Sequence, residues 1–307
     1  MRDTFVKTLI ELAKKDKTIE LVTGDLGFGV LKPFWEACPD QFTNAGIAEQ
    51  NMTSLAAGMS LGGKNVFTYS IGNFPTIRCL EQIRNDCAYH NANVKIVCVG
   101  GGFSYGPLGV SHHATEDLSI MKSIPNVFVF APGDLVEAEA VTIAAANYFG
   151  TAYIRLGRGG EQKIHSGNID FVIGKPLKIK AGKRIVLFST GTIISEVLKA
   201  ADLLSDYGFN AAVFSFPTIK PLNNLDVRKL AKEFDYIFTV EENTIVGGFG
   251  SSIASIVAEM KNKKASILNI GIPDSFVSKV GTQEYLRKEC GLDGESIVRK
   301  VIDYINE

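Results

Sequence analysis

The residue best placed for acid–base chemistry is Glu49, which lies in the segment 46–63 (GIAEQNMTSLAAGMSLGG). Apolar side chains recur at helical spacing after it, so the pattern predicts a helix over 46–61 with Glu49 in its first turn. The helix dipole favours a carboxylate at this position, although its neighbours are apolar. We interpret Glu49 as a working acid, with an exposed first-turn glutamate as the alternative.

Two adjacent histidines, His112 and His113, end a glycine-rich stretch at 100–113 (GGGFSYGPLGVSHH). Loops of this composition carry function more often than they support a core. Histidine titrates near neutral pH and suits proton transfer. We expect a functional loop here, with a solvated surface pair as the alternative.

Asp25 follows an apolar run at 19–23 that predicts a strand. In an open parallel sheet, the carboxyl ends of the strands host ligands. Asp25 is therefore a candidate site residue, and an Asx turn or a helix cap is the alternative interpretation.

These residues are spread over alternating strand and helix patterns in the first half of the chain. Predicted strands lie at 19–23, 66–69, 95–99 and 127–131, and predicted helices lie at 3–15, 46–61, 76–90 and 134–148. Such alternation indicates a mostly parallel sheet with helices on both faces.

A second alternating unit begins near residue 183. Its predicted strands lie at 184–189, 210–214, 236–240 and 266–270, and its predicted helices at 191–206, 227–233 and 248–260. We predict an α/β protein of two doubly wound domains, at 1–160 and 183–307, joined by a linker at 161–182.

Composition excludes several classes of protein. The 307 residues carry 32 basic and 33 acidic side chains, a net charge of −1, so no strong field attracts nucleic acid or a membrane surface. No apolar run reaches the roughly 18 residues of a membrane span. Five cysteines without a CxxC pair argue against disulfides or zinc, and we expect a cytoplasmic protein with reduced thiols.

Three specific pieces occur in a fixed order: 46–51 (GIAEQN), 121–126 (MKSIPN) and 155–158 (RLGR). With them, residues 2–305 resemble the pyrimidine-binding and C-terminal domains of thiamine-diphosphate enzymes of the transketolase family. The resemblance is greatest to the C-terminal subunit of split, two-gene transketolases.

The resemblance implies roles around the cofactor. Glu49 matches the glutamate that bonds a ring nitrogen of the aminopyrimidine and activates the cofactor. Phe74 is the candidate for stacking on that ring, with Ile71 or Tyr69 also lining the pocket, and core packing is the alternative for Phe74. Asp25 matches an aspartate near the cofactor and the subunit interface.

The resemblance also implies substrate contacts. His112 matches the histidine of the family's Thr-His-Gln loop, and His113 replaces the glutamine. Arg158 and Arg2 match arginines that bind the substrate phosphate, as bidentate guanidinium groups can. Arg155 could be the ligand instead, or a structural ion pair.

Leu108 departs from the family pattern, because an aspartate that reads sugar hydroxyls stands at this place in transketolase. Losing that acceptor changes which hydroxyl can be paired in the site. The usual transketolase substrates are therefore in question, and a phosphate, sulfonate or carboxylate on a modified sugar is compatible with the sequence.

The chain also lacks the Gly-Asp-Gly motif and downstream asparagine that hold the diphosphate through magnesium in this family. Asp25 and Asp134 each follow a glycine but lack the second one. We therefore expect no metal site in this chain. We expect an N-terminal transketolase subunit to bind the diphosphate and Mg²⁺, in a dimer of heterodimers.

The leading hypothesis is a subunit of a heteromeric transketolase that transfers a two-carbon glycolaldehyde unit from a ketose to an aldose. One alternative is the β subunit of a 2-oxo-acid or acetoin dehydrogenase, which passes an acyl group to lipoamide. A second alternative is a non-catalytic regulatory subunit.

Overall fold

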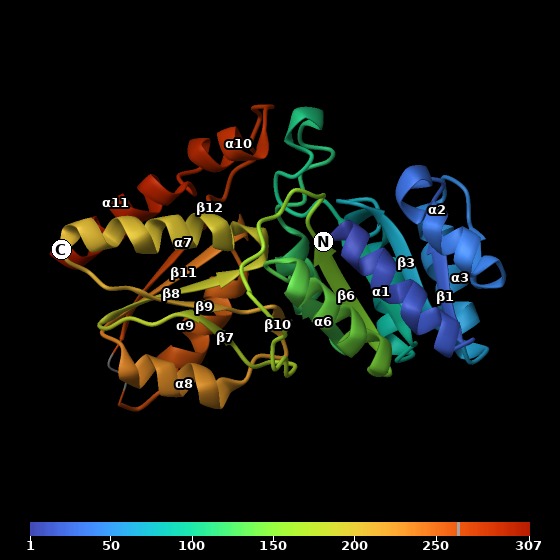
Figure 1. Ribbon diagram of the computed structural model, residues 1–307, viewed down its shortest axis with the longest axis horizontal. Helices are drawn as coiled ribbons and strands as arrows, with labels where there is room; N and C mark the ends of the chain where they lie inside the picture. The colour runs from blue at the N-terminus through green and yellow to red at the C-terminus, as the bar shows by residue number, and fades with distance from the viewer. Residues whose placement is uncertain (263–264) are drawn as a thin grey trace.

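Two α/β units lie side by side in the computed structural model, which describes residues 1–262 and 265–307. The first unit holds a seven-stranded sheet and the second a five-stranded sheet. Figure 1 shows the N-terminus near the junction of the two units and the C-terminus at the far end of the second.

The first sheet is parallel except for one edge strand. Its order is β10 (Thr218–Lys220), β5 (Val127–Phe130), β6 (Thr151–Leu156), β4 (Val94–Val99), β3 (Asn65–Ile71), β1 (Ile19–Thr23) and β2 (Phe42–Asn44). Only β10, which pairs with β5, runs antiparallel.

Helices cover both faces of this sheet. One face packs against α1 (Arg2–Lys15), α2 (Phe28–Ala37) and α6 (Leu135–Asn147). The other packs against α3 (Glu49–Leu61), the short α4 (Leu80–Gln82) and α5 (Asp117–Ser123). Side chains alternate between the faces, as the two-residue period of a strand requires: Val97 and Val99 face α1, and Ile96 and Cys98 face α3.

The second sheet has the order β12 (Ser266–Ile272), β11 (Tyr236–Thr244), β8 (Ile185–Thr190), β9 (Ala212–Ser215) and β7 (Leu177–Lys180). One face carries α7 (Ile194–Leu203), α10 (Gln283–Glu289) and α11 (Gly294–Asn306). The other carries α8 (Asn224–Glu233) and α9 (Phe249–Ala258). Both units are therefore doubly wound.

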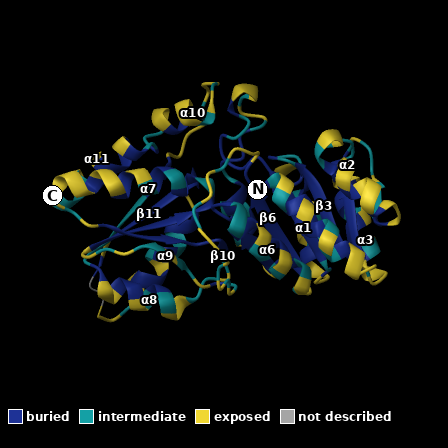
Figure 2. Cartoon of the chain, in the orientation of Figure 1, coloured by how far each residue is buried: buried dark blue, intermediate teal, exposed yellow. Residues whose placement is uncertain are grey.

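Burial on both faces explains why the strands appear in the sequence as continuous apolar runs. Every residue of β4, β6 and β8 is buried, as expected for parallel strands covered on both faces. Figure 2 shows buried strands in both units, while the outer sides of the helices are exposed.

Several expected elements differ from the structure. The helix expected from residue 46 begins at Glu49, because Gly46 has a φ of 75° and Ala48 is also non-helical. The helix expected at 76–90 is a 3-10 turn, the short α4 and a π-wound segment, Ile83–Tyr89. The linker expected at 161–182 contains β7, and β10 leaves the expected second domain to extend the first sheet.

Within the part of the chain that the structure describes, no helix is both long enough and apolar enough to cross a membrane.

Candidate active site at the carboxyl edge of the first sheet

Glu49 is the first residue of α3, and only 4% of its surface is exposed. Its Oε2 accepts a hydrogen bond of 2.8 Å from Nη1 of Arg78, the one side chain in the described residues that pairs with this carboxylate. A Cβ added to Gly24 would lie 3.5 Å from Cγ of Glu49, so the backbone after β1 packs closely beside it. The helix N-terminus favours the carboxylate, and Oε1 is left for a further donor.

The turn before α3 is held by Asn44 at the end of β2. Its Oδ1 accepts from the backbone N–H groups of Asp25 and Gly46, each at 3.0 Å, and its Nδ2 donates to Oδ1 of Asp25 at 2.8 Å. Asp25 has a φ of 57°, a left-handed conformation that aspartate tolerates. Asp25 thus lies at the carboxyl end of β1, and its carboxylate helps to fix the turn that presents Glu49.

Phe74 lies between the Glu49–Arg78 ion pair and His112. The Cζ atom of Arg78 lies 4.5 Å from the centroid of the Phe74 ring. The His112 ring meets the same ring edge-on, with centroids 5.1 Å apart. We call Glu49, Arg78, Phe74 and His112 the contact row, because three separate segments of sequence form one continuous line of contacts.

Ile71 and Tyr69 lie on β3 below Phe74 but differ in their surroundings. Ile71 is half-buried at the carboxyl end of the strand. Tyr69 is 1% exposed and stacks on Phe5 of α1 with centroids 6.2 Å apart, and burial raises its pKa. Tyr69 is therefore a core residue on the α1 face, and its position gives no support to the expected place in the cofactor pocket.

His112 is half-buried next to a hydroxyl, with its Nδ1 3.0 Å from Oγ of Ser111. Partial burial and the neighbouring His113 lower its pKa below the ordinary value of about 6.5. The ring is therefore neutral at neutral pH, and Nε2 can take part in proton transfer.

His113 has a different environment from His112. It is 2% exposed, its Nε2 lies 3.3 Å from the carbonyl oxygen of Gly106, and its ring meets Phe103 edge-on at 5.2 Å. A carbonyl can only accept, so Nε2 carries the proton. The two histidines are thus no solvated pair, and the structure places His113 inside the loop instead of in the expected contact with substrate.

Leu108 lies at the tip of the same loop, at the end of the 3-10 turn Gly106–Leu108. Its side chain is 57% exposed. At this position the loop presents an apolar surface and no side-chain acceptor.

Arg158 lies against Tyr105, and the charge of Arg2 also acts on that side chain. The Cζ atom of Arg158 lies 4.9 Å from the centroid of the Tyr105 ring. Burial raises the pKa of Tyr105, and the charges of Arg158 and Arg2 act against that rise. Tyr105 in turn lies beside His112, with ring centroids 6.4 Å apart. Two positive charges therefore lie at the end of the contact row that carries His112.

Arg155 is buried, with 6% of its surface exposed. Its Nε lies 3.1 Å from Oδ2 of the fully buried Asp117. Its Nη2 donates to the carbonyl oxygens of Ala114 and Glu242. Of the two interpretations that the sequence left open for Arg155, the structure selects the structural ion pair.

Sequence reasoning missed Arg78 and Tyr105, although each joins two predicted residues. The available signals were weak: Arg78 lies four residues after Phe74, and Tyr105 is an aromatic residue within the glycine-rich loop. Neither signal identifies the distant partner, Glu49 for Arg78 and Arg158 for Tyr105, because that partner lies on another segment of the chain.

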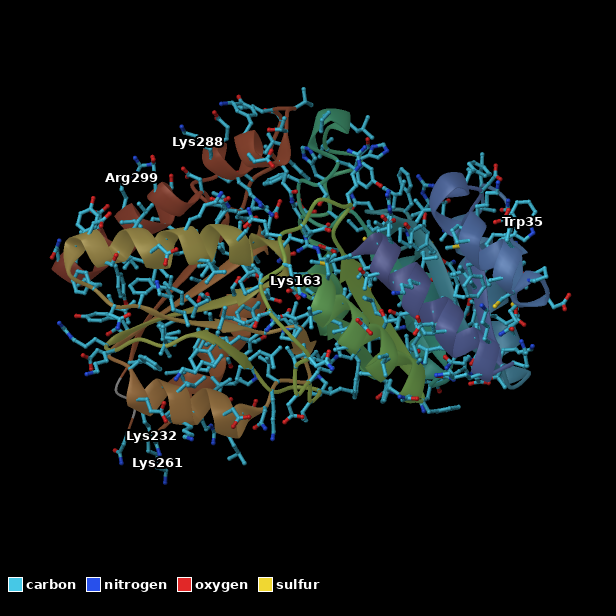
Figure 3. The ribbon with its side chains drawn as sticks, in the orientation of Figure 1. Trp35, Lys163, Lys232, Lys261, Lys288 and Arg299 are labelled. Atoms are coloured by element: carbon cyan, nitrogen blue, oxygen red, sulfur yellow. The ribbon has the colours of Figure 1, made fainter. Side chains whose placement is uncertain are left out.

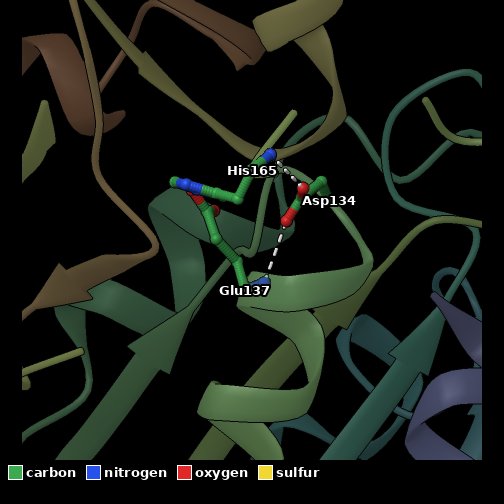
Figure 4. A group of neighbouring side chains, drawn as sticks. All are labelled: Asp134, Glu137 and His165. Atoms are coloured by element: carbon green, nitrogen blue, oxygen red, sulfur yellow. Dashed lines mark hydrogen bonds and ion pairs between the residues drawn. The ribbon is translucent and has the colours of Figure 1, made fainter. Parts of the chain in front are cut away.

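A second cluster of titratable groups joins Asp134 and Glu137 at the start of α6 to His165 (Figure 4). Asp134 accepts from the backbone N–H groups of Glu137, Ile164 and His165. Glu137 accepts from the N–H of Gly133 and contacts Nε2 of His165 at 2.9 Å. Every carboxylate oxygen of the cluster already has a partner. We therefore interpret these residues as a linker clasp that fastens the segment between the two units to α6.

These features define a class of protein: two doubly wound α/β units, with a buried carboxylate and aromatic rings at the carboxyl edge of the first sheet. Comparison with known families then gives the identity of the units. Residues 1–160 match the pyrimidine binding domain of transketolase, and residues 174–297 match the transketolase C-terminal domain. The chain belongs to the transketolase family.

Individual relatives agree with this assignment. The chain is 34% identical over 280 residues to one subunit of the apulose-4-phosphate transketolase of Actinobacillus succinogenes, covering 91% of this chain and 90% of that protein. It is 33% identical over 300 residues to the 6-deoxy-6-sulfo-D-fructose transketolase subunit of a Clostridium species, covering 97% and 92%.

A solved structure also aligns along nearly the whole chain. It is a split-gene transketolase described as an inactive β4 tetramer, with a TM-score of 0.88, 32% identity, and coverage of 98% of this chain and 96% of that one. These matches confirm the predicted fold and the resemblance to the C-terminal subunit of a split transketolase.

Proposed function

We propose that this chain is the pyrimidine-binding subunit of a two-subunit transketolase, which transfers a glycolaldehyde unit from a ketose to an aldose. The contact row is the observation that carries the proposal. It places a buried carboxylate, an aromatic ring and a neutral histidine next to one another at the edge of a parallel sheet where ligands bind.

The residues present fit thiamine diphosphate, the cofactor of this family. The free Oε1 of Glu49 is suited to a ring nitrogen of the aminopyrimidine, Phe74 to its flat face, and Ile71 to the pocket wall. When bound, the cofactor supplies the nucleophilic carbon that cleaves the ketose next to its carbonyl. The sequence lacks the family's diphosphate motif, so we assign the diphosphate and Mg²⁺ mainly to the partner subunit.

Each side chain then has a defined task. Glu49, buried at the start of α3, would bond the ring nitrogen through Oε1 and exchange with it the proton that activates the cofactor. His112 takes up or returns a proton at Nε2 on the substrate side. Arg158 and Arg2 bind an anionic group of the sugar, and the face of Tyr105 holds the Arg158 guanidinium in place.

The substrate we propose is an anionic, modified sugar. Leu108 offers no acceptor for a sugar hydroxyl at the loop tip, which disfavours the usual substrate pair. The two relatives are named for a sugar phosphate and a sulfonated sugar, and both carry an anion of the kind that a pair of arginines binds.

We further propose a dimer of heterodimers with an N-terminal subunit that carries the diphosphate-binding domain. The β4 tetramer of the related split enzyme is described as inactive, which supports a chain that needs its partner for turnover. The described cysteines are all free, in agreement with a cytoplasmic assembly.

The test is to reconstitute the chain with its partner subunit and to compare wild type with Glu49→Gln. Calorimetry measures thiamine-diphosphate binding with Mg²⁺, and turnover is measured with phosphorylated and sulfonated ketoses. We expect Glu49→Gln to lower kcat by about 10²- to 10⁴-fold, because a proton-transferring group is lost. The control is Glu20→Gln, a buried carboxylate on β1 that pairs with Lys64.

Other outcomes identify the alternatives. Unchanged binding and turnover in Glu49→Gln would contradict the assigned role of Glu49. Transfer to a lipoyl domain instead of an aldose would indicate a 2-oxo-acid dehydrogenase subunit. A reconstituted pair that binds no cofactor would indicate a regulatory subunit.

A further inference from the structure

The loop that carries His112 is closed at its base. Gly102 and Ala114 form an antiparallel bridge, with N–H to carbonyl distances of 2.8 Å and 3.0 Å. We call residues 102–114 the histidine loop. Inside it, Nε2 of His113 bonds the carbonyl of Gly106 and its ring packs on Phe103, so Phe103 contacts the residue next to His112.

The C-terminal domain holds this loop through Glu242 of β11. Oε1 of Glu242 accepts the backbone N–H of Phe103 at 2.8 Å, and the carboxylate is 2% exposed. The backbone carbonyl of the same residue accepts from Arg155, which also binds the carbonyl of Ala114 at the other end of the loop. One residue of the second domain is thus connected to both ends of the histidine loop.

The Glu242 carboxylate is itself fixed by α10. Nε and Nη2 of Arg287 donate to Oε2 at 3.1 Å and 2.6 Å. Nε2 of Gln283 lies 3.0 Å and 3.1 Å from the two oxygens and reaches Oγ of Ser104 at 3.3 Å. Charge-assisted hydrogen bonds of this kind are strong in a buried setting, and they also fix the orientation of the Glu242 carboxylate.

Close packing leaves the loop little freedom to adopt another path. Gly102 has a φ of 63°, and a Cβ added there would lie 2.5 Å from Cδ of Glu242. A Cβ on Gly106 would lie 2.4 Å from the carbonyl oxygen of Gly281, just before α10. Both glycines allow the loop backbone to touch the second domain.

We propose that Glu242 is a positioning residue for the transfer reaction, which holds the histidine loop so that His112 meets Phe74. The inference rests on the proposed function and assigns the C-terminal domain a part in it. The neighbouring Glu241 points elsewhere, since its carboxylate accepts the N–H groups of Phe249 and Gly250 at the start of α9.

The experiment compares Glu242→Gln with Glu196→Gln in the complex with the partner subunit. Glu196 is a matched control: it is 8% exposed, lies in the same domain, and accepts the N–H of Gly294 without touching the histidine loop. Hydrogen exchange is measured on 103–113, together with kcat, KM, cofactor affinity and thermal unfolding.

For Glu242→Gln we expect faster exchange of the histidine loop and a decrease in kcat/KM of about 10- to 100-fold, as small misplacements of catalytic groups cause. Cofactor affinity stays unchanged, because Glu49 and Phe74 lie on other segments. Glu196→Gln changes neither exchange nor kcat/KM.

Unchanged loop exchange, or faster exchange with unchanged kcat/KM, would overturn the inference. If Glu242→Gln does not fold, Gln283→Met decides by the same measurements, since it removes the neutral side chain that bonds Glu242 and Ser104 and leaves the Arg287–Glu242 pair in place. An inactive wild-type complex would contradict the proposed function instead; loop exchange would then show whether Glu242 holds the loop at all.

Discussion

His112 combines access, polarity and a shifted pKa within one side chain. Ser111 bonds one ring nitrogen, Phe74 supports the ring from the side, and burial with His113 lowers the pKa. A neutral imidazole at pH 7 can accept a proton, whereas the protonated ring cannot. The decrease in activity on the acidic side of the pH–activity profile should therefore reflect protonation of His112.

We predict that the activity of the reconstituted enzyme falls as the pH drops through a value below about 6.5, where His112 becomes protonated. In His112→Asn this dependence should disappear, and kcat should fall about 100-fold. The exposed His90 gives the control variant, His90→Asn, with an unchanged profile. A His112→Asn enzyme with the wild-type pH profile would assign the titration to another group.

At the scale of elements, the linker clasp joins the start of α6 to the segment that leads into the second unit. Asp134 caps α6 and also accepts two N–H groups of the linker. The hydrogen bond to Glu137 raises the pKa of His165. The charged form of His165 is thus the form that the clasp stabilises.

This contact predicts a pH-dependent linker. Because the folded pKa of His165 is raised, its stabilisation is complete below about pH 6.5 and is lost as the pH rises through the folded value. We expect hydrogen exchange of 161–170 to become faster, relative to β8, as the pH increases through this range, after correction for intrinsic exchange. His165→Asn should exchange fast at every pH; a linker with equal protection at both ends of the range would exclude this role.

At the scale of the whole molecule, one core is continuous through both units. The same cluster of buried side chains contains Met52 and Met121 beneath the first sheet and Val186, Phe214 and Phe249 around the second. A charge buried in the first unit therefore affects the unfolding of both, because neither sheet can separate without exposing shared apolar surface.

Lys95 is such a buried titratable group. It is fully buried on β4, where its Nζ donates to Oδ1 of Asn93 and to the carbonyl oxygen of Gly150, and burial lowers its pKa to about 7. Between about pH 7 and 10.5 the unfolded chain holds a proton that the folded chain has released. The contribution of Lys95 to the free energy of unfolding therefore rises with pH, by up to about 5 kcal/mol.

Urea unfolding at several pH values checks this prediction. The wild-type chain should gain stability over that range relative to Lys95→Met, which lacks the titrating group. Lys232 lies exposed on α8 (Figure 3), so Lys232→Met should keep the wild-type slope. Parallel curves for wild type and Lys95→Met would show that Lys95 stays charged in the folded protein.

The sequence by itself determined the α/β class, the positions of the long buried strands along the chain, and the location of Glu49 in the first turn of a helix. These features are local: a parallel strand covered on both faces is apolar along its length, and a helix repeats every 3.6 residues. Short edge strands such as β7 and β10 were not predicted, because only pairing with their neighbours in the sheet defines them.

The tertiary structure alone decided how the candidate residues meet. His112 and His113 are neighbours in sequence, yet one faces Phe74 and the other the interior of the loop. Phe103 and Glu242 are 139 residues apart and share a hydrogen bond. Local patterns record burial and backbone preference, whereas pairing between distant polar groups depends on the geometry that only the packed chain supplies.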